Sequence, residues 1–176
     1  MNAKKFGCIV QARLSSSRFP AKILLNGHDK SLLHHTIERL KASKFIDEII
    51  IATTTLQIDD VIFSLCKKNK IKVFRGHPTN LLKRYYDCAK KYNIQNIVRI
   101  TSDCPFIDPE LVDKIVKVYE DNDYDYVSNI INPTYPDGLD AEIFSFDVLK
   151  DRYQNARTSK EKEHVTYGIL NSKQYK

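Results

Sequence analysis

Residues 6–22 read FGCIVQARLSSSRFPAK, an apolar run followed by a polar loop. The run at 6–10 has the length and composition of a buried β-strand. The loop after it carries three cations, Arg13, Arg18 and Lys22, around the serines at 15–17. Cations and hydroxyls at the end of a buried strand are suited to phosphate oxygens. We therefore expect a phosphate-binding loop, with Lys22 on the reacting phosphate; a surface loop paired with nearby acids is the alternative.

The composition indicates a single globular domain. The chain has 176 residues, of which 42% are hydrophobic, enough to bury a core. No apolar run approaches the roughly 18 residues that cross a bilayer, so we expect a cytoplasmic protein without membrane insertion. The net charge of +6 comes from lysines spread over helical stretches. This spread favours solvated helix faces over a nucleic-acid site.

The four cysteines show no metal or disulfide spacing. They lie far apart, without a Cys-x-x-Cys motif or a nearby histidine, at Cys8, Cys66, Cys88 and Cys104. This pattern indicates reduced thiols. The sequence also offers no Ser-His-Asp or Cys-His arrangement, so covalent catalysis has no support.

Strand-like runs alternate with helix-period segments. We expect strands at residues 7–12, 48–53, 72–75 and 96–100, and helices at 31–44, 58–69, 81–92 and 109–120. Helix starts are expected at Ser31, Thr79 and Asp108-Pro109. This order predicts a mostly parallel α/β sheet with right-handed crossovers. Beyond residue 124 the sheet is expected to become mixed, with strands at 125–128 and 142–146 and helices at 147–155 and 160–170.

Polar residues follow each of the first four expected strands. Because ligands bind at the carboxyl ends of strands in open α/β sheets, these clusters should meet at one edge. Asp103 directly follows the apolar strand at 96–100. A single carboxylate opposite a phosphate loop suits Mg²⁺, which prefers one or two carboxylates with phosphate oxygens and water. The alternative is a helix cap, but Asp108 already serves the next helix.

Two further segments carry weaker candidates. In YPDGLDAE (135–142), Asp137 fits an ordinary Asp-Gly turn. Asp140 and Glu142 are two residues apart and share one face of a strand, which makes them the better ligand candidates. His164 falls on the helix expected at 160–170 and faces either a site or solvent.

Seven segments of the chain, in order, resemble a known family. They are IVQARLSSSRFPAKIL (9–24), EIIIATTT (48–55), VFRGHPTNLLKRYYDCAKKY (73–92), IVRITSDCPFIDPELVD (97–113), YDYVSN (124–129), YPDGLDAEIFS (135–145) and EHVT (163–166). These segments are similar to blocks of the cytidylyltransferases of the spore coat polysaccharide (SpsF) group. That group is related to the enzymes that make CMP-Kdo and CMP-sialic acid.

The resemblance implies a three-layer α/β/α sandwich, the GT-A-like fold of nucleotide-diphospho-sugar transferases. It also implies an enzyme that uses Mg²⁺ to transfer CMP from CTP to a sugar, an acidic sugar by this similarity, for cell-surface polysaccharide biosynthesis. By the same resemblance Lys22 and Arg13 are catalytic, and Asp140 and Glu142 border the sugar pocket. Asp103 holds the metal, and the nucleotide is bound by Arg13, Ser16, Arg18, Lys22 and Arg84.

The chain also departs from the family pattern. Ser15 and Ala21 replace glycines of the loop, and Asn80 and Lys83 replace acids before Arg84, which leaves the choice of nucleotide open. Relatives continue past EHVT into a segment with a further strand, a second metal acid and part of the dimer contact. We therefore expect residues 1–176 to form one domain without that segment, and a homodimer stays open.

Two alternatives follow. One is a glycosyltransferase of the same fold, for which Asp123-Tyr124-Asp125 resembles an acid-x-acid metal motif. The other is a non-catalytic nucleotide-binding remnant.

Overall fold

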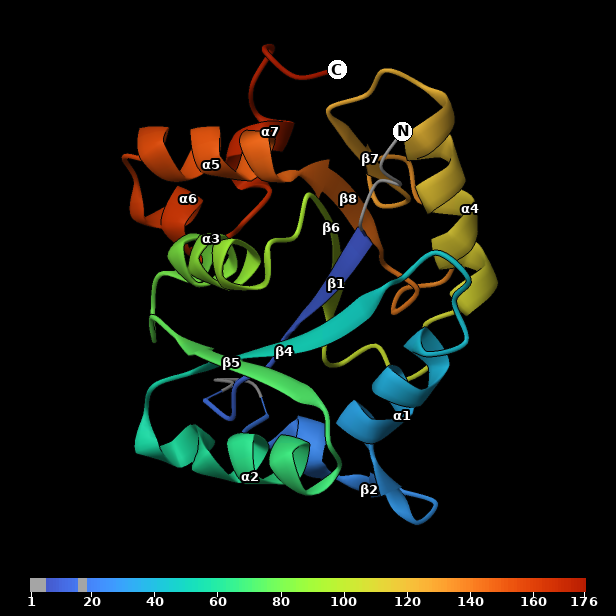
Figure 1. Ribbon diagram of the computed structural model, residues 1–176, viewed down its shortest axis with the longest axis vertical. Helices are drawn as coiled ribbons and strands as arrows, with labels where there is room; N and C mark the ends of the chain where they lie inside the picture. Colours follow the sequence, from blue (N-terminus) through green and yellow to red (C-terminus); the bar gives the residue numbers. More distant parts are fainter. Residues whose placement is uncertain (1–5, 16–18) are drawn as a thin grey trace.

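Six strands form one mixed sheet at the centre of the molecule (Figure 1). The computed structural model describes residues 6–15 and 19–176. The strands lie in the order β5-β4-β1-β6-β8-β7. Their bounds are β1 (Phe6–Gln11), β4 (Glu48–Thr54), β5 (Lys72–Gly76), β6 (Asn96–Thr101), β7 (Tyr126–Ser128) and β8 (Glu142–Ser145).

The sheet changes direction where the sequence alternation weakens. β1 is parallel to both β4 and β6, and β5 is parallel to β4. β8 runs antiparallel to β6 and to β7. The prediction of a mostly parallel sheet that becomes mixed after residue 124 is confirmed.

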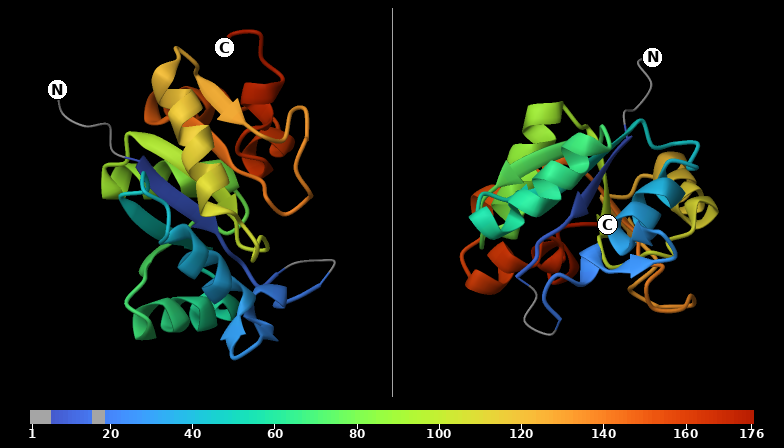
Figure 2. Two further views of the ribbon diagram at one scale, coloured as in Figure 1. Left: turned by 90° about the vertical axis from the view of Figure 1, so that its right-hand side faces the viewer. Right: turned by 90° about the horizontal axis from the view of Figure 1, so that it is seen from below.

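Helices cover both faces of the sheet, which gives the three layers (Figures 1 and 2). Their bounds are α1 (Leu32–Leu40), α2 (Asp60–Lys68), α3 (Leu81–Tyr92), α4 (Pro109–Asp121), α5 (Phe146–Asn155), α6 (Ser159–Glu163) and α7 (Tyr167–Leu170). Buried side chains of α1, α2 and α4 form one core cluster with the sheet, and those of α3, α5 and α7 form the other. Along β1, Cys8 and Val10 join the first cluster and Ile9 the second, as the alternation of a strand requires.

Local hydrogen bonds explain where the helices begin. The Ser31 hydroxyl accepts from the amide of His34 at the start of α1, and Asp108 caps α4 ahead of Pro109, as expected. The cap of α3 is Asn80, which accepts from the amide of Lys83, so the expectation of Thr79 was wrong by one residue.

Two parts of the chain differ from the expected elements. The helix expected at 160–170 is interrupted: α6 ends at Glu163, the backbone of His164 is extended, and α7 begins at Tyr167. α6 begins at Ser159, one residue before the expected start, where a capping box between Thr158 and Glu161 fixes it. A short hairpin of β2 (Asn26–Gly27) and β3 (Lys30–Ser31) precedes α1, and two single-turn helices, η1 (Lys22–Leu24) and η2 (Gln57–Asp59), complete the elements.

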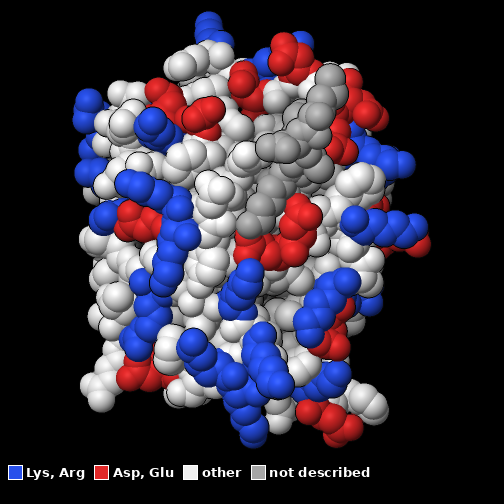
Figure 3. Space-filling model, in the orientation of Figure 1, with Lys and Arg blue, Asp and Glu red and all other residues white. Residues whose placement is uncertain are grey.

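Charged side chains are scattered over the surface. On the face drawn in Figure 3, Lys and Arg side chains lie over several elements with acidic side chains between them. This distribution agrees with solvated helix faces.

Candidate active site

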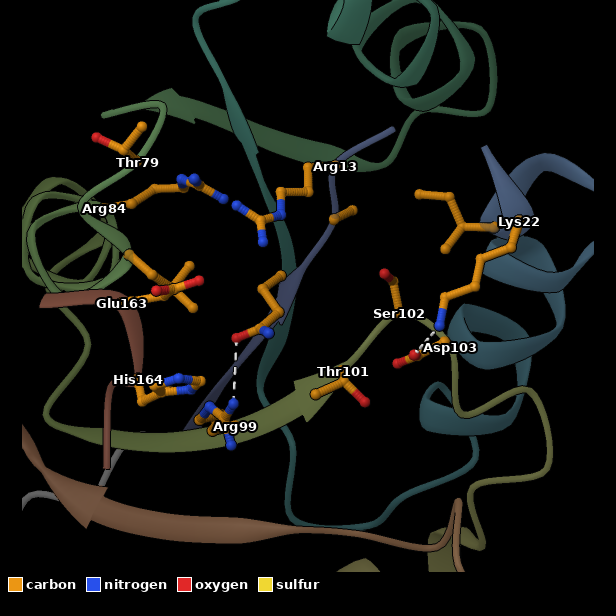
Figure 4. Close-up of a pocket in the computed structure, with 14 residues that line it drawn as sticks. Arg13, Lys22, Thr79, Arg84, Arg99, Thr101, Ser102, Asp103, Glu163 and His164 are labelled. Carbon is orange, nitrogen blue, oxygen red and sulfur yellow. Dashed lines mark hydrogen bonds and ion pairs between the residues drawn. The ribbon is translucent and has the colours of Figure 1, made fainter. Parts of the chain in front are cut away.

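A cavity of about 300 Å³ opens near the carboxyl ends of β1 and β6 (Figure 4). Side chains from widely separated parts of the chain line it, among them Arg13, Lys22, Arg84, Arg99, Asp103 and His164. The loop expected to bind phosphate and the acid after the fourth strand of the predicted series thus meet in one space, at the edge where open α/β sheets bind ligands.

The loop after β1 is held at both of its ends. The amide of Ala21 donates to the carbonyl of Leu14 (3.0 Å), and the amide of Leu14 donates to a carboxylate oxygen of Asp59 (2.8 Å). Asp59 is fully buried, and its other oxygen accepts from the hydroxyl of Thr54 at the end of β4. Asp59 therefore fixes the start of the loop against the neighbouring strand, a role that the sequence did not suggest.

Ala21 occupies one of the positions where the family resemblance leads us to expect glycine. Its φ of 56° lies in the left-handed region, which an alanine adopts at a penalty of roughly 1–2 kcal/mol. The loop thus keeps a glycine-like backbone despite the substitution. Ser16 and Arg18, two of the predicted nucleotide ligands, lie outside the described residues.

Lys22 and Asp103 meet directly inside the cavity (Figure 4). Their side chains form an ion pair that joins the loop after β1 to the turn after β6. Asp103 also accepts from the hydroxyl of Thr101. Partial burial acts to raise the pKa of Asp103, but the bonds from Lys22 and Thr101 outweigh burial, and the pKa lies below its ordinary value. Asp103 is therefore an ionised carboxylate that is still 38% exposed to the cavity.

Arg84 is a buried cation at the wall of the cavity. Arg84 is only 1% exposed, and its guanidinium donates to the carbonyls of His77 (2.9 Å) and Pro78 (2.8 Å). Burial lowers the pKa of Arg84 to about 10, so it stays charged at neutral pH. Gly76 permits this packing, because a Cβ atom there would lie 2.7 Å from Cγ of Arg84. Arg84 thereby shapes the segment that connects β5 to α3.

The two acids expected at a sugar pocket lie in different surroundings. Glu142 is 2% exposed, and both of its carboxylate oxygens are engaged, one by Arg99 and the other by the hydroxyl of Tyr126 (2.8 Å). Asp140 is half-buried, and burial together with the nearby Asp137 raises its pKa. Neither residue is among the described residues that line the cavity, so a direct sugar contact stays a prediction for Asp140. Glu142 acts on the cavity through Arg99.

The break after α6 brings Glu163, which was not a candidate, and His164, for which the sequence left a site or solvent open, to the cavity. Glu163 and His164 line it opposite the loop after β1 (Figure 4). The amide of His164 donates to the carbonyl of Lys160 (2.9 Å), and its carbonyl accepts from the amide of Tyr167 (3.0 Å). The EHVT segment (163–166) was the feature of the sequence that pointed to these residues. The continuous helix expected at 160–170 did not predict that both side chains would line the cavity.

Other candidate groups lie away from the cavity. Asp125, part of the acid-x-acid segment, accepts from the amide of Lys176 and does not line the cavity. The four cysteines are free and buried, Cys104 included. Burial raises the pKa of the Cys104 thiol beside Asp103, which keeps it protonated at neutral pH. Within the described ranges, no helix has the length and apolar character needed to cross a membrane.

A six-stranded α/β/α sandwich that brings cations after β1 beside a carboxylate after β6 has the fold of the nucleotidyltransferase class. Residues 7–175 match the model of the family described as Cytidylyltransferase, and the chain belongs to this family.

Two curated relatives align with most of the chain. An uncharacterised protein, MJ1063, of Methanocaldococcus jannaschii is 43% identical over 90% of this chain and 64% of its own length. The spore coat polysaccharide biosynthesis protein SpsF of Bacillus subtilis is 34% identical over 93% of this chain and 69% of its own length. The chain thus spans about two thirds of the length of these relatives.

Solved structures confirm the fold. A cytidylyltransferase from Leptospira borgpetersenii superimposes with a TM-score of 0.93, at 38% identity over 98% of this chain and 74% of that one. A CMP:2-keto-3-deoxy-manno-octonic acid synthetase in complex with CTP superimposes with a TM-score of 0.69, at 17% identity over 95% of this chain and 84% of that one. The latter likeness concerns the fold alone.

Proposed function

We propose that this protein transfers CMP from CTP to a hydroxyl group of a sugar, with Mg²⁺ as cofactor. One observation carries the proposal: the loop after β1 and the turn after β6 direct Lys22, Arg13 and Asp103 into one cavity. Cations that neutralise a triphosphate must face the carboxylate that holds its metal ion, and this arrangement meets that need.

The residues present fit a magnesium ion shared with phosphate. Asp103 offers an ionised carboxylate that is open to the cavity, and the hydroxyls of Thr101 and Ser102 lie beside it. Residues 6–15 and 19–176 contain no group of three or more His, Cys, Asp or Glu side chains placed to hold a metal. A site with few protein ligands suits Mg²⁺, which keeps waters and binds substrate phosphates. When bound, the ion supplies charge neutralisation at the phosphate oxygens.

The reaction needs positioning more than a strong base. The acceptor oxygen forms a bond to the α-phosphorus, the bond from that phosphorus to the bridging oxygen of the β-phosphate breaks, and pyrophosphate leaves while the hydroxyl proton passes to water. Arg13 and Lys22 stabilise the negative charge that develops on the leaving group. Asp59, by fixing the loop, keeps these cations at the distance that the in-line approach requires.

The relatives support the choice of substrates. The synthetase of the same fold was crystallised with CTP, and the B. subtilis relative is named for spore coat polysaccharide biosynthesis. We extend both properties to this chain: CTP as the nucleotide, and an acidic sugar of a cell-surface polysaccharide as the acceptor.

The test is release of pyrophosphate. The protein is incubated with CTP, Mg²⁺ and a panel of sugar acids, and pyrophosphate is measured with and without each sugar, with Asp103→Asn as the matched inactive variant. Sugar-dependent release by the wild type alone supports the proposal. CTP-dependent thermal stabilisation with no release from any sugar would instead identify a nucleotide-binding protein without activity.

A further inference from the structure

Arg99 lines the cavity at the end away from Lys22 and Asp103 (Figure 4), and it forms a buried ion pair with Glu142, which lies outside the lining. Arg99 in β6 lies directly opposite Glu142 in the antiparallel strand β8. The Nη1 group of Arg99 donates to one oxygen of Glu142, and the hydroxyl of Tyr126 donates to the other (2.8 Å). Both oxygens of the carboxylate that holds Arg99 are therefore engaged by protein groups.

The edge of the Arg99 guanidinium formed by Nε and Nη2 has few hydrogen-bond partners. Its Nη2 group donates to the side-chain oxygen of Gln11 over 3.4 Å, a long hydrogen bond. Its Nε group is buried and has no hydrogen-bond partner among the described residues. Nε and Nη2 form the planar fork by which arginine binds two oxygens of one anion. Since the side chain is 15% exposed and lines the cavity, a ligand oxygen that displaces Gln11 would reach this fork.

Structural stabilisation alone does not account for a charged pair in this position. A buried ion pair is often no more stabilising than a well-packed pair of apolar side chains of similar size. What the pair provides is a cation whose orientation is fixed by Glu142 before any ligand arrives.

The position along the cavity separates Arg99 from the triphosphate ligands. Arg13 and Lys22 come from the loop beyond the end of β1, whereas Arg99 lies within β6, beside His164 from the break after α6 (Figure 4). In the register of the sheet, Arg99 is level with Ile9, two residues before the end of β1. The cavity thus carries two cationic subsites, one at the loop and one over the sheet.

We propose that Arg99 is a specificity residue that binds an oxyanion carried by the acceptor, a carboxylate or a phosphate, and that Glu142 is the residue that positions it. This inference rests on the proposed function for the identity of the reaction. The binding it describes is measurable without turnover.

The experiment follows the Nε–H resonance of Arg99 by NMR in the full chain with Mg²⁺ and a non-hydrolysable CTP analogue. The probes are N-acetylneuraminate for a carboxylate, mannose 1-phosphate for a phosphate, and mannose as the neutral sugar. We expect a saturable shift with one anionic probe and none with mannose. A shift with mannose of equal size, a shift saturated by the CTP analogue alone, or no shift with any probe would overturn the proposal.

Variants separate positioning from folding. Glu142→Gln and Arg99→Lys should weaken binding of the responding anionic probe by about tenfold or more, because a charge-assisted fork is lost, while the affinity for the CTP analogue changes less than about threefold. The double variant Arg99→Gln with Glu142→Gln leaves no unpaired buried charge, so it should stay folded and still lose anion binding. If the variants weaken binding of the anionic probe and of the CTP analogue equally, Arg99 contacts the nucleotide and the proposal fails.

A matched control is the ion pair of Lys72 and Glu48, which joins β5 to β4 at their amino ends (2.6 Å). Lys72→Gln with Glu48→Gln should leave anion binding unchanged. If the sugar panel gives no pyrophosphate but the Arg99 signal responds to an anionic probe, the proposed function fails and this inference stands. The reverse result overturns the inference and leaves the function intact.

Discussion

The two ends of the sheet use charged residues in different ways. At the amino ends, Lys72 pairs with Glu48 across neighbouring strands, and Asp47 accepts from the amide of Phe6 (2.7 Å). At the carboxyl ends, Lys22 and Asp103 also pair, but both line a cavity and remain partly exposed to it. Pairs at the first end hold strands together. In the proposed function, the pair at the second end holds charges that exchange partners with a ligand.

The largest effect is expected from Asp103→Asn. The amide keeps the size of the side chain but removes the charge that would hold a metal beside the phosphates, so Mg²⁺-dependent turnover should fall by about a thousandfold or more. The measurement is the rate of pyrophosphate release at saturating CTP and Mg²⁺. The melting temperature serves as the control and should change little, because Asp103 is partly exposed. Turnover within a few-fold of the wild type would remove Asp103 from the metal site.

Lys22→Ala should have the next largest effect. Loss of a charge-assisted bond to phosphate is expected to weaken CTP binding by about tenfold or more. Isothermal titration with CTP and Mg²⁺ measures the affinity directly. The same substitution at Lys72, at the other end of the sheet, is the matched control. Equal affinities of the two variants would contradict the distinction between the two ends.

Asp59→Ala tests whether the loop depends on a buried anchor rather than on its own cations. The change leaves the amide of Leu14 and the hydroxyl of Thr54 without their acceptor, which should lower the free energy of unfolding by about 1–3 kcal/mol. Urea unfolding measures this loss, and CTP titration of the folded variant measures the accompanying loss of affinity. A destabilised variant with normal CTP affinity would show that Asp59 stabilises the fold without positioning the loop.

The sequence predicted the parts of the site that are local and missed those that depend on distant pairing. The loop at 11–22 and Asp103 stand out because each directly follows an apolar strand, and strand ends meet in space by topology. Asp59 is 45 positions from Leu14, and no local pattern indicates that contact. Arg99 was read as part of an apolar strand, although a charge inside such a run is itself a signal. The family resemblance placed its partner Glu142 at the sugar pocket, and strand parity made it a ligand candidate, but parity gives only the face of a side chain and not its neighbour.

A small effect is expected from breaking the pair at the amino ends. The side chain of Lys72 is 56% exposed but that of Glu48 only 7%, and the double substitution leaves no unpaired charge in the buried position, so Lys72→Gln with Glu48→Gln should change the free energy of unfolding by about 1 kcal/mol or less. Pyrophosphate release should be unchanged, because neither residue approaches the cavity. Loss of activity in this variant would mean that activity depends on the pairing of β4 with β5 and not only on the charged side chains at the carboxyl ends.

The smallest effect concerns the order in which two neighbouring acids titrate. The pKa of Asp103 is lowered, so its ionisation favours the folded state above the unfolded value of 3.8, and this contribution is lost as the pH falls through the folded pKa. The pKa of Asp140 is raised by burial and by the charge of Asp137. The effect on stability therefore has the opposite sign, because ionisation of Asp140 as the pH rises destabilises the folded state. Carboxyl ¹³C NMR should therefore show Asp140 taking up a proton before Asp103 as the pH is lowered. In Lys22→Ala the two titration midpoints should move closer together, because the bond that lowers the pKa of Asp103 is gone. An unchanged separation would show that Lys22 does not lower the pKa of Asp103.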